Sequence, residues 1–473
     1  MSVSFCWLEE GGMQTDRGTT VSTSSKKRQQ QPFSRVAPLL RAALLLGTGG
    51  GFALATVLTL TAAFAISIGP WWSATAQAHG HLQLYGWAGL FVLGVAFHFL
   101  PRLRGAPLAA PRLVPWIPGT LVLGLLLRAL SQPLFAATGA PIWPLLLVAS
   151  GVLECAAFVG AALLLPITAI QGPPMSTHPA LKGILPFIVG AFGMLALASV
   201  VNLINMIVAT TTAGQVPGPI DDLNVTLGLF GYLVPMALAI SAQSLPMYAG
   251  LEAFPRRILW PLAGIDFTGL VLTIFGSQLA LFSRILTGIG MLLIGLVLLA
   301  FTIVFIRIMS IRGSLPRKVA QLAPSPEAAA QTYKKKISGE RNAYGPFVVL
   351  VASAYLWAIL AAALLIVDGL TLLFVGAPFF ALDAIRHSLA IGFITLLICG
   401  IAPRMLPGFS GKKIASPALV SATLLRVGSI LLAPLLIAIN VAGVSLYAIL
   451  FGISGPIGLA LVICLTVNLW PAL

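Results

Sequence analysis

Charged residues are scarce in this sequence. They make up 8% of its 473 residues, whereas 58% are hydrophobic and the mean hydropathy is +1.01. A globular domain carries roughly a quarter charged residues, so the composition excludes a soluble protein and indicates a chain surrounded mostly by lipid. Cysteine is scarce too, and the absence of a Cys-x-x-Cys pair argues against a disulfide framework or a zinc site. The four cysteines are Cys6, Cys155, Cys399 and Cys464.

Acidic residues are even scarcer than basic ones. There are 12 Asp and Glu against 27 Lys and Arg, giving a formal net charge of +15. A surplus of basic residues is also typical of nucleic-acid binding. Here, however, most basic residues lie between long apolar runs, and no stretch of the sequence alternates basic with aromatic residues. We therefore expect no nucleic-acid partner and take the lipid bilayer as the main surroundings.

Twelve apolar runs reach the length of about 20 residues that a transmembrane helix needs. They cover roughly 40–67, 79–101, 114–137, 142–169, 184–210, 222–246, 258–281, 286–310, 345–368, 384–407, 417–442 and 445–470. The sequence thus predicts an all-α polytopic membrane protein with a single twelve-helix domain over 37–473. The polar first 36 residues are predicted to be a disordered, basic cytoplasmic tail.

The basic loops predict the orientation of the spans. Lys and Arg are concentrated in the loops that follow the even-numbered spans, most of all in 312–344, whereas the opposite loops contain little more than Arg284 and Arg386. Because Lys and Arg favour the cytoplasmic side, we expect both termini in the cytoplasm and 312–344 to be a cytoplasmic loop.

Spans 2 and 10 carry the same motif without a gap. His81 aligns with His387, Gly86 with Gly392, Gly94 with Gly400, Pro101 with Pro407, and Gly105 with Gly411. Span 6 holds a weaker copy, with Thr226 in the histidine position and Gly231 five residues later. We therefore predict three quasi-repeats of four helices, over about 37–170, 184–310 and 345–471. The glycines are expected to let helices pack closely, since lipid gives helices no hydrophobic drive to associate.

The aligned histidines are the first candidates for a functional site. Ionisable residues inside a membrane are costly and usually functional, and His81 and His387 are expected at similar depth near the outer ends of their helices. Two imidazoles on two helices of a bundle are the ingredients of a bis-histidine haem site. A hydrogen-bonded packing role is the simpler alternative for each histidine.

His79 complicates this assignment. It precedes His81 by two residues, about 200° around a helix, so that both side chains cannot face the same iron. The repeat favours His81 as the ligand. His79 is then a donor behind the ligand, a metal ligand at the outer surface, or a solvated residue at the helix terminus.

These features resemble two families. Twelve helices in three repeats, with histidines on spans 2 and 10, look like subunit I of haem-copper oxidases, in which those helices hold the low-spin haem. The motifs of His81 and His387 more narrowly resemble those of the NnrS family, bacterial membrane proteins linked to the nitric-oxide response. The resemblance implies haem, with b-type favoured and copper as a second metal through His79. It also implies the bacterial cytoplasmic membrane and a small gaseous ligand.

The sequence departs from the oxidases where their chemistry occurs. Their binuclear centre needs copper-ligating histidines on spans 6 and 7 and a second histidine on span 10, and none of these is present here. Oxygen or nitric-oxide reduction by the usual route is therefore not expected, and whether the protein is an enzyme stays open.

Other intramembrane charges need partners. Arg128 in span 3 and Arg426 in span 11 occur in similar local sequences, and haem propionates or buried acids would satisfy them. Glu154 and Asp266 are the available acids, as proton relays or as arginine partners. A secondary transporter lined by these four residues is the alternative function, and an electron-transfer subunit with a quinol or protein redox partner is another.

Overall fold

The computed structural model describes residues 33–64, 66, 69–174, 179–249, 254–278, 283–310, 324–420 and 445–473. In these ranges the chain forms helices and no strands. The helical elements are η1 (Phe33–Arg35), α1 (Ala37–Leu46), η2 (Gly47–Phe52), α2 (Ala53–Ala63), α3 (Trp71–His81), η3 (Leu82–Gly89), α4 (Leu90–Arg104), α5 (Trp116–Thr138), α6 (Ile142–Ile170), α7 (Pro179–Thr211), α8 (Gly218–Thr226), η5 (Leu227–Leu233), α9 (Val234–Ala249), α10 (Arg256–Gln278), α11 (Ser283–Ser310), α13 (Pro326–Tyr344), α14 (Phe347–Phe374), α15 (Leu382–His387), η7 (Ser388–Thr395), α16 (Leu396–Ser410), α19 (Ser445–Leu469) and η8 (Trp470–Ala472).

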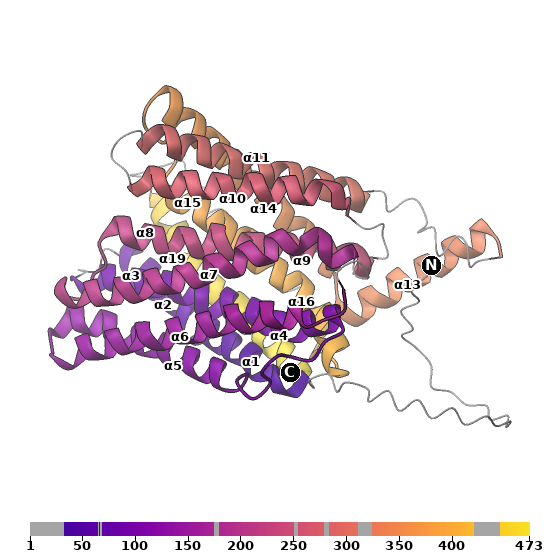
Figure 1. Ribbon diagram of the computed structural model, residues 1–473, viewed down its shortest axis with the longest axis horizontal. Helices are drawn as coiled ribbons and strands as arrows, with labels where there is room; N and C mark the ends of the chain where they lie inside the picture. Colours follow the sequence, from indigo (N-terminus) through magenta and orange to yellow (C-terminus); the bar gives the residue numbers. More distant parts are fainter. Residues whose placement is uncertain are drawn as a thin grey trace.

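The described helices form one elongated bundle whose members run roughly along its length (Figure 1). Eleven helical stretches in the described ranges are long and apolar enough to cross a membrane. They correspond to eleven of the twelve expected spans, and the protein is a multi-pass, all-helical membrane protein. The predicted span 417–442 lies almost wholly outside the described residues, as do the polar tail and Arg426.

Three spans form the centre of the bundle. In Trp71–Arg104, Gly218–Pro246 and Leu382–Ser410, 94, 83 and 83% of the most apolar stretch is buried, against 28 to 50% in the other described spans. These are spans 2, 6 and 10, the three that carry the repeated motif.

Polar bonds join these central spans. Trp87 Nε1 donates to Thr395 Oγ1 (3.1 Å), Tyr85 donates to the Asn224 carbonyl oxygen (3.1 Å), and Tyr232 donates to the Gly89 carbonyl oxygen (3.1 Å). In a bundle without a hydrophobic drive between helices, such bonds help to fix which faces meet.

Each central span contains a π-helical segment that begins directly after the aligned motif position. The segments η3, η5 and η7 follow His81, Thr226 and His387. A π-turn leaves carbonyl groups in irregular positions. Leu84 in span 2 and Ala390 in span 10 carry two such carbonyls at equivalent positions, and their surroundings differ. An added Cβ at Gly89 would lie 2.6 Å from the Leu84 carbonyl oxygen, whereas the Thr395 hydroxyl donates to the Ala390 carbonyl oxygen (2.9 Å). Such π-segments are rare and frequently mark functional sites.

The motif glycines have equivalent packing roles in the repeats. A Cβ at Gly231 would lie 2.8 Å from Met194 in span 5, and one at Gly392 would lie 2.6 Å from Trp357 in span 9. Gly86 likewise lies against span 1, where Leu46 is 3.6 Å away. Each of these glycines thus lies close to the span that precedes its own. This shared packing role explains why the motif recurs in every fourth span of the sequence.

One expected boundary is wrong, and one expected loop contains a helix. Span 2 begins at Trp71, after the Gly69-Pro70 break, so His79 lies two turns inside the helix and is not a terminal residue. The loop 312–344 contains the helix α13. Its signals are present in the sequence: Ser325 accepts a hydrogen bond from the Ala328 N–H (3.2 Å), and Gly345 ends the helix at φ +70°.

We predict that Gly369→Ala destabilises the fold. A Cβ there would lie 2.7 Å from Leu292 and 2.8 Å from the Gly288 carbonyl oxygen, and a backbone atom cannot move aside cheaply. Overpacking of this kind costs about 1–3 kcal/mol. Unfolding of the detergent-purified protein should show the loss. Gly193→Ala is the matched control, because nothing lies within 4 Å of that position; equal stability of the two variants would contradict the packing account.

Candidate haem site and buried polar ring

A cavity of about 570 Å³ lies between the central spans 2, 6 and 10 and the outer spans 1 and 12, at the end of the bundle that holds His79, His81 and His387. We call this the histidine end. The three histidines line the cavity together with two arginines and two acids, Arg128, Arg386, Asp221 and Asp383. Much of the remaining lining is apolar and includes Phe52, Leu58, Trp87 and Phe451. It combines a mostly apolar wall with a few polar groups, as ligand sites do.

His79 and His387 have the same hydrogen-bond arrangement. Nδ1 of His79 lies 2.8 Å from the Gly51 carbonyl oxygen, and Nδ1 of His387 lies 2.7 Å from the Asp383 carbonyl oxygen. A carbonyl oxygen only accepts, so each Nδ1 must carry the proton and each Nε2 must carry the lone pair. Among the described residues neither Nε2 has a hydrogen-bond partner. This is the state of metal-ligating histidines, whose other ring nitrogen donates to a carbonyl or carboxylate.

His81 is in a different state. Its Nδ1 lies 2.7 Å from an Arg128 nitrogen, and its Nε2 lies 2.5 Å from Glu154 Oε2. Arginine can only donate, so Nδ1 accepts from Arg128, and Nε2 carries the proton that it donates to Glu154. Both nitrogens of the imidazole are engaged, and its side chain is buried.

A fourth side chain closes these bonds into a ring. Asn202 accepts a hydrogen bond from Arg128 through Oδ1 and donates to Glu154 Oε2 through Nδ2 (3.2 Å). The buried polar ring therefore consists of His81 on α3, Arg128 on α5, Glu154 on α6 and Asn202 on α7, all of them buried. It joins four consecutive spans at one depth.

Two glutamines extend the ring toward the histidine end. Arg128 Nε donates to Gln132 (3.1 Å), and Gln132 donates to Gln77 (2.9 Å). Gln77 in turn bonds both the N–H and the carbonyl oxygen of Val216, between α7 and α8. Sequence reasoning missed Asn202, Gln132 and Gln77. Side-chain amides are rare in apolar spans, and this rarity could have marked these three residues as candidates. Only the fold shows which amide bonds to which charged group.

The remaining candidate residues lie elsewhere. Asp266 is buried on α10, and its Oδ2 has no hydrogen-bond partner among the described residues. Arg386 contacts Asp222 (2.7 Å) and Asp383 (3.4 Å) at the cavity mouth. Arg404 bonds Glu340 of α13 (3.1 Å) and lies over Tyr344. His98 is buried, with its ring against Phe33 and Phe409.

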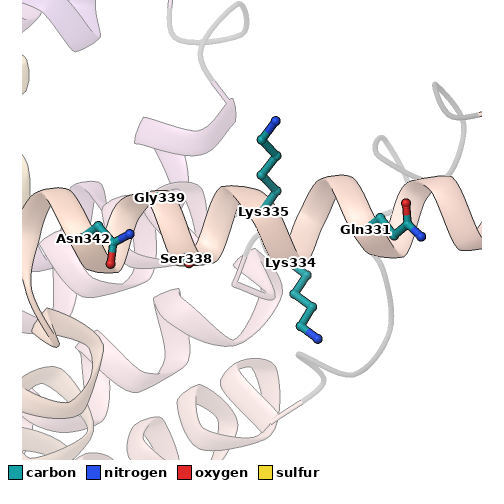
Figure 2. Close-up of a pocket in the computed structure, with 6 residues that line it drawn as sticks. All are labelled: Gln331, Lys334, Lys335, Ser338, Gly339 and Asn342. Atoms are coloured by element: carbon teal, nitrogen blue, oxygen red, sulfur yellow. The ribbon is translucent and has the colours of Figure 1, made fainter.

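A second hollow lies along α13 and is not a candidate site. It is lined by Lys334, Lys335 and four neighbours on the same helix. Figure 2 shows the two lysine side chains pointing to opposite sides of the helix, so they do not converge on a ligand. Nor do the described residues contain a group of three or more His, Cys, Asp or Glu side chains that could hold a metal ion.

The fold matches that of a solved haem-copper terminal oxidase. A solved structure of a haem-copper terminal oxidase dimer aligns with a TM-score of 0.64 at 10% sequence identity, covering 91% of this chain and 84% of that one. The chain therefore has the fold of haem-copper oxidase subunit I. No protein-family model matches the sequence, and no curated protein matches it either. The similarity to the NnrS family accordingly rests on the motifs alone.

We predict that the buried ring is strongly coupled. Glu154→Leu removes the carboxylate that accepts from His81 and Asn202, and leaving buried polar groups unsatisfied costs about 1–3 kcal/mol each. The double variant Arg128→Leu/Glu154→Leu removes both charges and should lose clearly less than the sum of the two single variants. A double-mutant cycle on unfolding in detergent measures this, and additive losses would show that the two residues do not interact.

Proposed function

We propose that this protein is a membrane haem protein in which His79 and His387 are the two axial ligands. The observation that carries the proposal is that both histidines line one cavity and both hold Nδ1–H against a backbone carbonyl, leaving an Nε2 lone pair. The fold supports it, since the similar solved structure is that of a haem-copper terminal oxidase.

His79 replaces His81 in this proposal. The repeat pairs His81 with His387, but binding iron through His81 would require breaking its bond to Glu154 or its bond to Arg128. His79 is two residues away on the same helix, so it faces about 200° away, toward span 1. Its bond to Gly51 is consistent with that direction.

The cavity suits a haem in other respects. Its volume lies within the range of roughly 300–1000 Å³ that is typical of ligand sites. Its lining is mostly apolar, which suits the porphyrin face. Arg128 and Arg386 also line it and are the proposed partners of the propionates. The same role for Arg426 is a sequence-based proposal, because that residue lies outside the described residues.

When bound between two histidines, a b-type haem would supply one-electron transfer, or ligand binding if one histidine can leave the iron. This chain's own residues would hold the ring, orient the two imidazoles and exclude water. From the motif similarity we further propose a role in the response to nitric oxide, with the histidine end facing outward in a bacterial cytoplasmic membrane. Copper, a quinol and a protein redox partner remain proposals from the sequence.

We predict a six-coordinate, low-spin haem spectrum for the protein purified after expression with haem available. His79→Ala and His387→Ala should each abolish that signal, because each removes one axial ligand. His81→Ala should keep the low-spin signal, because His81 is not a ligand, but should bind haem more weakly, because it removes the bonds to Arg128 and Glu154. Oxidised and dithionite-reduced absorption spectra measure this, and His98→Ala serves as a control because His98 lies in a separate aromatic cluster.

Loss of the low-spin signal in His81→Ala with retention in His79→Ala would reverse the ligand assignment. A folded wild-type protein without a Soret band would overturn the haem proposal and favour transport. Nitric oxide added to the reduced protein tests the gas-binding part: a changed spectrum supports displacement of one histidine, and an unchanged one argues for electron transfer.

A further inference from the structure

We infer that Glu154 is a positioning residue for the haem ligand His79, acting through the buried polar ring and His81. This inference rests on the proposed function. Glu154 does not line the cavity, so its effect must pass through residues that do.

The first step is the fixed orientation of His81. His81 makes two bonds in the ring: Arg128 donates to Nδ1, and Nε2 donates to Glu154 Oε2. Asn202 donates to the same carboxylate oxygen and so holds the acceptor. The imidazole is thus held from both nitrogens, and neither rotation nor a change of tautomer is compatible with the ring. An intramembrane site offers no bulk water to replace a lost partner.

The second step links His81 to His79. The two residues are in the last turn of α3, on nearly opposite sides of one helix. The bonds of His81 to α5 and α6 fix the rotation of α3 about its own axis. His79, on the opposite side of the helix, is therefore directed toward span 1 and the cavity. The Gly51 carbonyl then receives Nδ1–H of His79 at 2.8 Å.

The third step is the place where the ring attaches. His81 is the last residue of α3, and the π-helical segment η3 begins at Leu82. Backbone hydrogen bonds continue across this junction, since the Leu82 N–H donates to the Ala78 and His79 carbonyl oxygens. The ring adds side-chain bonds at the junction itself, through His81. His387, which also precedes a π-segment, bonds a carbonyl of its own helix.

Glu154 variants test the inference through the haem spectrum and affinity. Glu154→Leu cannot accept a bond from His81, so α3 is released. We expect the haem dissociation constant to rise about tenfold or more, as for lost partners of metal ligands, and the paramagnetic resonance of the oxidised low-spin haem to split into several forms. Glu154→Gln keeps an oxygen acceptor in the same place. Unlike Glu154→Leu, it should keep the wild-type haem affinity and the single resonance signal.

Asp266→Asn is the matched control. Asp266 is another buried intramembrane carboxyl, but it lies on α10 and outside the ring, so its loss should leave the haem unchanged. Unfolding in detergent is measured for every variant. If Glu154→Leu does not fold, Asn202→Ala opens the ring at another corner and should broaden the haem signal.

The possible outcomes separate the two proposals. A folded Glu154→Leu protein with wild-type haem affinity and an unchanged signal overturns the positioning role while the haem site stands. A Glu154→Gln variant as defective as Glu154→Leu also overturns it, since the negative charge and not the bond geometry would then matter. Wild-type protein without haem overturns the proposed function and this inference together.

Discussion

A charged group inside a membrane must find its partners within the protein, and the buried polar ring is how this chain meets that constraint. Arg128 and Glu154 would each be prohibitively costly alone. Together with His81 and Asn202 they bond one another across four helices, with Glu154 Oε1 left without a partner among the described residues. Because every member depends on the others, the relative depth and rotation of spans 2, 3, 4 and 5 are set jointly beside the cavity.

The same constraint separates two histidines that look interchangeable in the sequence. His81 is buried on the side of α3 that faces the ring, and its nitrogens are used in the ring. His79 faces the other way, where only a backbone carbonyl takes one nitrogen. The π-segments η3, η5 and η7 lie at equivalent places in the central spans, yet only η3 and η7 are preceded by a histidine. The repeat provides a common scaffold, and the side chains around each copy decide its chemistry.

Much of the fold could be predicted from the sequence because its signals are local. Span lengths follow from apolar runs, and the repeat follows from glycines that must face a neighbouring helix, as Gly231 and Gly392 do. The helix α13 was missed although Ser325 and Gly345 mark its ends. The ligand assignment was not predictable in the same way. His81 and Glu154 are 73 residues apart, and only the folded chain shows that a carboxylate on α6 occupies the nitrogen that a haem iron would need.

We propose that the haem lies between His79 and His387 while His81 remains in the ring. A cryo-electron microscopy map of the protein purified with haem is the decisive measurement. We expect planar density in the cavity, joined at its centre to Nε2 of both His79 and His387, with His81 still between Arg128 and Glu154. Iron density joined to His81, or a haem outside this cavity, would rule out this arrangement.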